Sequence, residues 1–124
     1  MLGFSGIYLF LCRKDKAMVQ HSIFINQIHD VARKSIPQGG RMLLFGSQAR
    51  GDAREDSDWD ILILLEKEKI AFEDFDVVAY PFVEMGWRMG VTVSPLLYTF
   101  SDWERRKFTP FYKNVEQDGI ELWH

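Results

Sequence analysis

Two aspartates, Asp58 and Asp60, stand two positions apart at the start of an apolar run, and Gly46 and Ser47 follow the preceding apolar run. Residues two apart on a β-strand share a face, with Cα atoms about 6.5 to 7 Å apart. Both carboxylates can therefore approach one divalent cation or a pair of them. Hard oxygen ligands favour Mg²⁺ or Mn²⁺. These residue types and their spacing indicate metal-dependent phosphoryl chemistry.

The residues around the two aspartates suit a bound phosphate as well. Gly46 has no Cβ, so phosphate oxygens can reach the main chain, and the hydroxyl of Ser47 adds a donor. Arg50 and Arg54 lie in the connecting segment, where a guanidinium can grip phosphate with two hydrogen bonds. A bound cation would also offset the cost of placing two like charges at the start of a very apolar strand.

Each part of this pattern is common by itself. A Gly-Ser pair is usually a turn, and an Asp-x-Asp pair is usually a solvated turn or a helix cap. A calcium-binding loop beginning at Asp56 is excluded, because Ile61 stands where that loop requires glycine and Lys67 where it requires glutamate. The specific signal is the combination of a strand, Gly-Ser, ten residues, Asp-x-Asp and a second strand.

Hydrophobic periodicity predicts an α/β (α+β) fold, a small mixed sheet flanked by helices. Within the second strand, Trp59 and the isoleucines that follow should point away from the face that carries the aspartates. Pro81 is expected to kink the helix that contains it or to shift its start, and a capping pattern at Ser101 predicts a helix start there. The expected elements are a helix over 19–34, a strand over 41–45, a helical turn and loop over 47–56, a strand over 59–65, a helix over 72–89, a strand over 91–99, a helix from 101 and a last helix over 110–117.

Composition indicates one globular domain. The chain has 124 residues, of which 47% are hydrophobic and 27% charged, as expected for a protein with a single core. Its formal net charge of −3 argues against broad binding of nucleic acid, which normally requires a basic surface. A nucleotide is not excluded, because a metal ion and a few arginines can meet its charge locally.

The N-terminal segment is predicted to lie outside this domain. Residues 1–17 are expected to be a disordered extension or a misassigned start, with Met18 as the first residue and 18–124 as the folded domain; an extra strand or a weak contact with a membrane surface are the alternatives. The apolar run at the N-terminus is shorter than the roughly 20 residues of a membrane helix. The single cysteine, Cys12, cannot form an internal disulfide, which favours the cytoplasm.

The central motif resembles that of the minimal nucleotidyltransferases of the DNA polymerase β superfamily, in particular the MntA-like antitoxin branch. Gly46 and Ser47, ten intervening residues and the Asp58-Trp59-Asp60 triplet match its signature without an insertion. The resemblance implies the polymerase β-like fold and transfer of a nucleoside monophosphate, expected to be AMP from ATP, to a hydroxyl acceptor. It also implies that the Gly-Ser pair cradles the triphosphate and that the two aspartates are catalytic and hold Mg²⁺ or Mn²⁺.

One departure from the family pattern concerns a third carboxylate, which fully active members usually carry on a later strand. The corresponding strand here is expected at residues 91–94, where Thr92 and Ser94 offer hydroxyls instead. Acids such as Asp74, Asp76 and Glu84 are expected on the preceding helix, facing water. Either two carboxylates suffice, another acid substitutes, or catalysis is weak or lost.

The resemblance also implies a partner, because this short chain has no room for a separate acceptor domain. Such transferases are typically paired with a small all-helical HEPN-type toxin and can attach AMP to one of its tyrosines. Two alternatives remain open: a binding module that neutralises a partner by contact alone, and transfer to a small molecule such as an aminoglycoside. Neither a specific nucleic acid nor a membrane is expected as a partner.

Overall fold

The computed structural model describes residues 12–54 and 56–124, with side chains described from residue 22 onward. Most of the predicted N-terminal extension lies outside this range, so that prediction stays untested. The elements are α2 (Cys12–Ser35), β1 (Arg41–Phe45), α3 (Gly46–Arg50), β2 (Trp59–Leu65), the π-helical turn η1 (Phe75–Ala79), α4 (Tyr80–Arg88), β3 (Val93–Thr99), α5 (Phe100–Arg105), α6 (Pro110–Asp118) and β4 (Ile120–Trp123).

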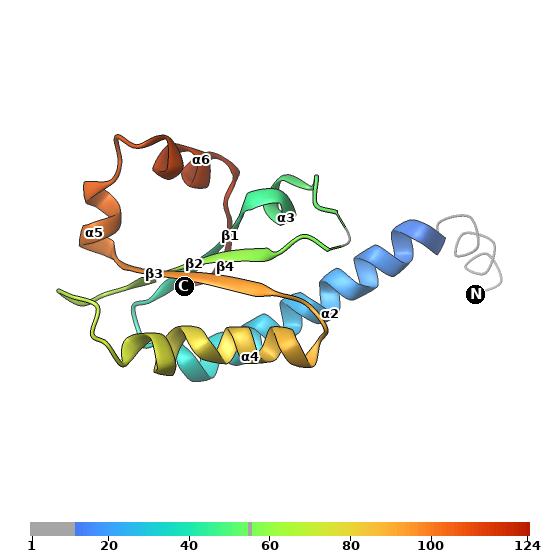
Figure 1. The fold of residues 1–124 in the computed structure, drawn as a ribbon, viewed down its shortest axis with the longest axis horizontal. Coiled ribbons are helices and arrows are strands. Elements are labelled where there is room, and N and C mark those ends of the chain that lie inside the picture. Colours follow the sequence, from blue (N-terminus) through green and yellow to red (C-terminus); the bar gives the residue numbers. More distant parts are fainter. Residues whose placement is uncertain (1–11, 55) are drawn as a thin grey trace.

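The described strands form a mixed sheet in the order β3-β2-β1-β4. Strand β1 is antiparallel to both β2 and β4, whereas β2 and β3 run parallel. The predicted fold class, a small mixed sheet flanked by helices, is confirmed (Figure 1). The register places Phe45 and Ser94 on either side of Asp60, so the side chains of these three residues share one face of the sheet.

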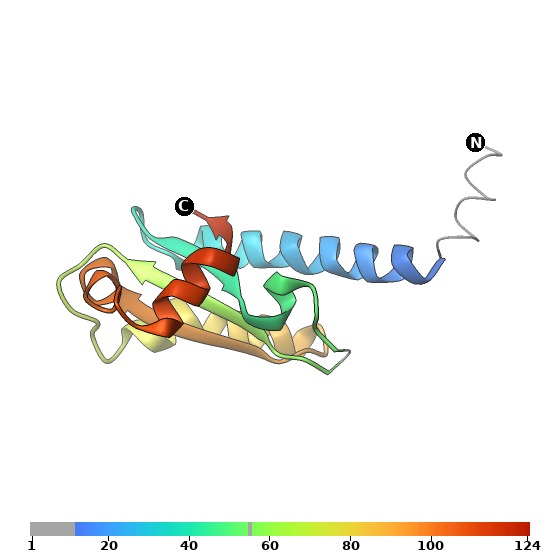
Figure 2. The same ribbon diagram turned by 90° about the horizontal axis from the view of Figure 1, so that it is seen from above.

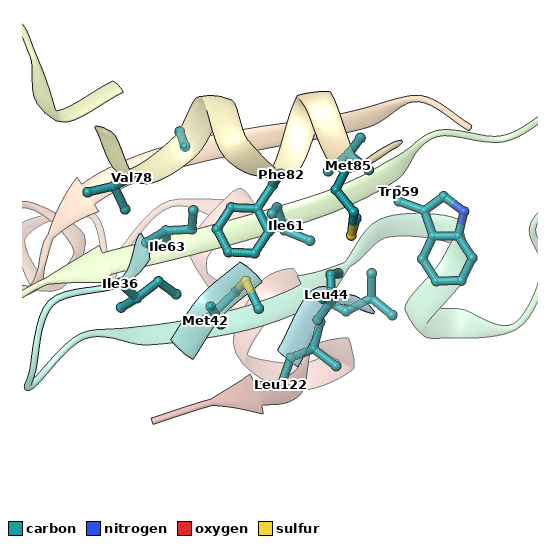
Figure 3. Close-up of a cluster of buried hydrophobic side chains, with 14 of the residues drawn as sticks. Ile36, Met42, Leu44, Trp59, Ile61, Ile63, Val78, Phe82, Met85 and Leu122 are labelled. Carbon is teal, nitrogen blue, oxygen red and sulfur yellow. The ribbon is translucent and has the colours of Figure 1, made fainter. Parts of the chain in front are cut away.

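Helices α2 and α4 cover one face of the sheet, and α2 continues beyond the sheet edge (Figures 1 and 2). The core on this side includes Ile61 and Ile63 of β2, both fully buried, against Phe82 of α4 (Figure 3). Trp59 stacks on Phe24 of α2, with ring centroids 3.8 Å apart. Burial of each such side chain contributes about 1.5 to 3 kcal/mol, which strongly favours the register that points the aspartates the other way.

Helices α3, α5 and α6 lie on the opposite face (Figure 1). Leu62 and Leu64 of β2 pack there with Trp103 of α5 and Val115 of α6 in a second, smaller core. Asp58, by contrast, is exposed, so this cover does not extend over the beginning of β2. The aspartate face is therefore closed at one end by α5 and α6 and open at the other.

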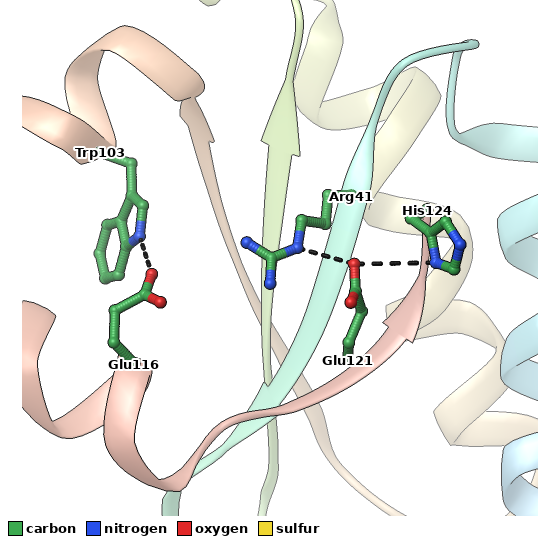
Figure 4. Close-up of polar contacts among 5 residues, drawn as sticks. All are labelled: Arg41, Trp103, Glu116, Glu121 and His124. Atoms are coloured by element: carbon green, nitrogen blue, oxygen red, sulfur yellow. Dashed lines mark hydrogen bonds and ion pairs between the residues drawn. The ribbon is translucent and has the colours of Figure 1, made fainter.

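Strand β4 was missed by the sequence prediction, which ended the last helix before Asp118. It is held beside β1 by an ion pair between Arg41 Nε and Glu121 Oε1 at 2.7 Å, and His124 Nδ1 lies 3.7 Å from the same oxygen (Figure 4). On α6, Glu116 accepts a hydrogen bond from the indole of Trp103 at 2.9 Å. These contacts hold β4 beside β1 and α6 beside α5.

Helix α2 begins at Cys12 and not at residue 19, and two later helix starts also differ from the sequence prediction. The helix predicted from residue 72 begins with the π-helical turn η1, and Pro81 then falls in the first turn of α4, directly after that turn. Helix α5 is capped by Thr99 and not by Ser101, because the Thr99 hydroxyl accepts the N–H of Asp102 at 3.0 Å.

Asp74 anchors the loop that leads into η1. Its carboxylate accepts hydrogen bonds from Lys67 Nζ at 2.7 Å and from the Ala71 N–H at 2.6 Å, and these bonds lower the pKa of Asp74. We expect Asp74→Asn to reduce the free energy of unfolding by about 1 to 2 kcal/mol at pH 7. Because the folded-state pKa is the lowered one, this contribution is complete above the unfolded pKa of about 3.9 and disappears as pH falls through the folded value.

Urea denaturation at pH 7 and at pH 3 tests this expectation. The difference between wild type and Asp74→Asn should shrink at the lower pH, while Glu73→Gln, a change at the exposed neighbouring acid, should have little effect at either. An equal difference at both values of pH would contradict the assigned role of the carboxylate.

Candidate active site

The two aspartates lie at the beginning of β2, on the face opposite the main core. Asp60 is the second residue of the strand and Asp58 directly precedes it. Trp59, between them, is buried on the other side at 7% exposure. Ser94 of β3 donates a hydrogen bond from its hydroxyl to Asp58 Oδ2 at 3.4 Å. The structure thus brings together the two carboxylates that the sequence analysis singled out.

The electrostatics of Asp60 indicate a site that favours a cation. Burial raises its pKa and the neighbouring carboxylate of Asp58 raises it further, while Arg50 acts in the opposite direction. Two like charges are therefore held together at some cost. Carboxylate oxygens on one open face suit Mg²⁺ or Mn²⁺, whose remaining ligands are usually water and substrate phosphates. The donor set therefore fits such an ion, which would relieve the repulsion.

Gly46 joins β1 directly to α3 and lies against Asp60. Its φ is +74°, and a Cβ at this position would lie 2.5 Å from Asp60 Oδ2. No side chain caps the first N–H groups of α3. Glycine is thus required both by the backbone conformation and by the close approach of the carboxylate. The sequence analysis predicted the need for glycine here, although it assigned the open space to phosphate and not to Asp60.

We expect Gly46→Ala to displace Asp60 and to weaken binding of ATP with Mg²⁺ by about ten-fold or more, since even small misplacement of a site group is costly. Calorimetric titration of the variant measures this. Gly51→Ala is the matched control, because Gly51 has a similar φ of +82° but nothing within 4 Å of an added Cβ. Equal losses in both variants would show that backbone strain, and not contact with Asp60, is responsible.

The predicted phosphate ligands lie around α3. Arg50 ends the helix, with Nε 3.2 Å from Asp52 Oδ2, and it is close enough to Asp60 to influence its pKa. Ser47 is half-buried in the first turn. Arg54 lies in the exposed loop that follows, where its N–H donates to the Ser57 hydroxyl at 2.7 Å. The structure therefore places Gly46 and Arg50 beside the aspartates, and Arg54 on the adjacent loop.

In the segment where a third carboxylate was expected, Ser94 is the residue that pairs with Asp60 across the two strands. The acids considered as substitutes are elsewhere: Asp74 bonds Lys67, and Glu84 bonds Arg88 at 3.1 Å on α4, over the opposite face. Within the described parts of the chain, no group of three or more His, Cys, Asp or Glu side chains could hold a metal ion. The described residues therefore give no support to the idea that one of these acids takes the role of the third carboxylate.

An open hollow of about 210 Å³ adjoins the site between α3 and α6. The sequence analysis did not foresee the contribution of α6 to it, because nothing local marks a helix more than 60 residues downstream as a neighbour of Gly46. The hollow is lined by Phe45, Gly46, Arg50, Phe111, Asn114, Val115 and Asp118.

Comparison with known proteins identifies the family. The family model described as a nucleotidyltransferase domain matches residues 25–120, which include strands β1, β2 and β3 and both aspartates. The chain belongs to this nucleotidyltransferase family. The resemblance to the minimal nucleotidyltransferases, inferred from the central motif, is thereby confirmed.

Two relatives of this nucleotidyltransferase come from Methanocaldococcus jannaschii and are described as "Putative protein adenylyltransferase" MJ0141 and MJ0604. The first is 33% identical over 66% of this chain and 77% of its own length. The second is 30% identical over 81% of this chain and 91% of its own length. Nucleotidyl transfer is thus the activity named both in the description of the family and in those of the two relatives.

Two solved structures share the fold. A toxin–antitoxin crystal structure with AMP-PNP has a TM-score of 0.57 and 22% identity, covering 80% of this chain and 72% of the other. A mutant of the toxin–antitoxin MntA-HpeT has a TM-score of 0.56 and 19% identity, covering 80% and 71%. Among the helices of the nucleotidyltransferase that the structure describes, none combines the length and apolarity needed to cross a membrane.

Proposed function

We propose that this nucleotidyltransferase transfers AMP from ATP to a hydroxyl group of a partner protein, within a domain formed by residues 18–124. The observation that carries the proposal is the pair Asp58 and Asp60 on one open face of the sheet, with Gly46 packed against the second carboxylate. The protein adenylyltransferase names of the two archaeal relatives favour AMP as the transferred group.

In this reaction the acceptor oxygen forms a bond to the α-phosphorus, the bond from that phosphorus to the bridging β-phosphate oxygen breaks, and pyrophosphate leaves. The hydroxyl proton passes to a base or to water. Asp58 and Asp60 act as the catalytic carboxylates by holding Mg²⁺, or Mn²⁺ in its place. When bound, the cation supplies charge stabilisation for the phosphate oxygens. Arg50 is positioned to neutralise phosphate charge beside these carboxylates.

The other phosphate contacts follow from the start of α3 and the loop after it. We assign the N–H groups at Gly46 and Ser47, and the Ser47 hydroxyl, to the triphosphate. Arg54 lies on the exposed loop that follows α3, and its guanidinium would meet the phosphates from solvent. Positioning and charge neutralisation supply most of the catalysis in such transfers.

The acceptor we propose is a HEPN-type toxin, with this chain as its antitoxin in the cytoplasm. The face that carries the aspartates is open beside Asp58, which leaves room for a protein acceptor. The two structural neighbours come from toxin–antitoxin complexes, and one was crystallised with AMP-PNP. Those titles describe the neighbours, and they support the proposal for this chain by analogy of fold.

Incubation with ATP labelled on the α-phosphate, Mg²⁺ and a co-expressed HEPN-type partner tests the proposal. Label should appear on the partner, and intact-mass spectrometry should show the mass of one or more AMP groups. Omission of Mg²⁺ should prevent the transfer. An unlabelled partner that is nevertheless neutralised by the chain would contradict the enzymatic proposal.

One observation favours a second candidate, a binding module that neutralises its partner by contact. A serine, Ser94, pairs with Asp60 in the strand where a third carboxylate was expected, and a hydroxyl cannot serve as a metal ligand or base as a carboxylate can. For this candidate, neutralisation of the partner should survive loss of both aspartates. The same labelling experiment, repeated with the Asp58→Ala, Asp60→Ala double variant, distinguishes the two.

A further inference from the structure

The hollow between α3 and α6 adjoins the proposed site. Gly46 belongs to both: it lines the hollow, and a Cβ placed on it would meet Asp60. Helices α3 and α6 lie on the same face of the sheet (Figures 1 and 2). A molecule that reaches the aspartates can therefore extend into the hollow without crossing another element. With about 210 Å³ the hollow is smaller than the roughly 300 to 1,000 Å³ of sites that enclose a drug-sized ligand, so it would hold only part of a nucleotide.

Aromatic rings form one wall of the hollow. Phe45 ends β1 and lies opposite Asp60 in the sheet register, and Phe111 of α6 meets its ring edge-on, with centroids 5.5 Å apart. Phe111 is 36% exposed, and its other side packs against Trp103 at 5.7 Å. An exposed aromatic surface held in place by further aromatic contacts is suited to stacking against a planar base.

Polar groups stand on the α6 side of the same hollow. Asn114 and Asp118 are four residues apart and so share one face of the helix; both line the hollow. An asparagine amide carries a donor and an acceptor side by side, which match the N6 and N7 atoms of adenine. A carboxylate only accepts, and it favours a base that presents an amino group.

We propose that this hollow receives the nucleobase of the nucleoside triphosphate, with Asn114 and Asp118 contacting the edge of an adenine ring and Phe45 and Phe111 contacting its face. This inference rests on the proposed function and extends it, because it assigns α6 as the element that selects the nucleotide. The α-phosphate then lies over the aspartates.

The alternative occupant is the leaving pyrophosphate. The charge of the lining disfavours it: Arg50 is its one cation and Asp118 contributes an anion, so the formal charge of the lining is zero, and three of the remaining residues are apolar. Burying several phosphate charges against two phenyl rings and a carboxylate costs more than one arginine returns. A flat, weakly polar heterocycle meets no such penalty.

Competition binding with three probes tests the proposal: ATP, AMP and inorganic tripolyphosphate, each with Mg²⁺. For Asn114→Ala we expect the affinities for ATP and for AMP to fall by a similar factor, about ten-fold. The affinity for tripolyphosphate should equal that of the wild type. Asp118→Asn keeps the shape of the side chain, and it should reduce the ratio of the affinity for ATP to the affinity for inosine triphosphate. The base of inosine triphosphate carries an oxygen where adenine carries its amino group. Gln117→Ala, an amide deletion on α6 outside the lining, is the control and should change none of these values.

The outcomes separate the possibilities. If Asn114→Ala weakens tripolyphosphate together with ATP, the hollow holds phosphates and the proposal is wrong. If ATP, AMP and the ratio of ATP to inosine triphosphate stay unchanged in both variants, the base lies elsewhere and the proposal is equally wrong. Failure of the proposed function has a different signature, because the wild-type chain would then leave its partner unlabelled with ATP and Mg²⁺, whatever the two variants bind.

Discussion

Replacement of Asp60 by asparagine is expected to abolish nucleotidyl transfer, with a loss of at least about a hundred-fold, since even the partners of metal ligands are typically worth ten- to a hundred-fold. The variant removes one of the two carboxylates that we assign to the cation. It should also lose the rise in melting temperature that Mg²⁺ and ATP together produce in the wild type. Asp76→Asn, at an exposed acid on η1, is the matched control.

For the unliganded chain, the same variant is not expected to lower the melting temperature. Burial and Asp58 raise the folded-state pKa of Asp60. A carboxyl group with a raised folded pKa favours folding at low pH and opposes it once the pH exceeds that value. At pH 7, Asp60→Asn should therefore melt no lower than the wild type without metal. A variant that is less stable and still transfers AMP would contradict both parts of the assignment.

The second large effect is expected from Ser94→Asp. Ser94 pairs with Asp60 and contacts Asp58 at 3.4 Å, so an aspartate there would place three carboxylates around one point. Without metal, the added repulsion should lower the melting temperature. With Mn²⁺ or Mg²⁺ the variant should regain stability, bind the cation about ten-fold more tightly and transfer AMP faster than the wild type.

Ser94→Asn is the control for this experiment, because it has the same shape without the charge. Calorimetric titration with Mn²⁺ gives the affinity and the number of ions bound, independently of activity. A variant that binds the metal no better than Ser94→Asn would show that position 94 is not placed to complete the site. In that case the two-carboxylate site would be the full metal site of the protein.

The local hydrophobic pattern was sufficient to predict those elements of the fold that a single segment specifies by itself. The strand over residues 59–65 was predicted with the bounds that the structure has, because uninterrupted burial of Ile61, Leu62, Ile63 and their neighbours requires an apolar run. The side of the sheet to which the aspartates point was also predictable, since alternation in a strand allows only two arrangements.

Parts that depend on distant contacts were not predictable in this way. Strand β4 has only four residues and is stabilised by pairing with β1 and by the contact of Glu121 with Arg41. The hollow beside the site is lined jointly by Asn114 of α6 and by Gly46 and Arg50 of α3. The sequence of neither segment indicates which element it will contact. Strand β4 and the hollow therefore both depend on tertiary packing.

The α4 region shows a third kind of limit. Its apolar spacing predicts one helix over 72–89, whereas the structure has a π-helical turn before Tyr80. Hydrophobic periodicity alone does not distinguish a π turn from an α turn at the start of a helix. The aspartates are unaffected, because this segment covers the opposite face of the sheet.

The most direct test of the account is calorimetric titration of the wild-type chain with a non-hydrolysable ATP analogue, in Mg²⁺ and in a chelator. We expect saturable binding with Mg²⁺ that weakens by at least ten-fold in the chelator, because Asp58 and Asp60 repel the phosphates unless a cation lies between them. Binding of equal strength in both conditions, or none in either, would contradict the claim that these two carboxylates hold a metal ion against a nucleotide.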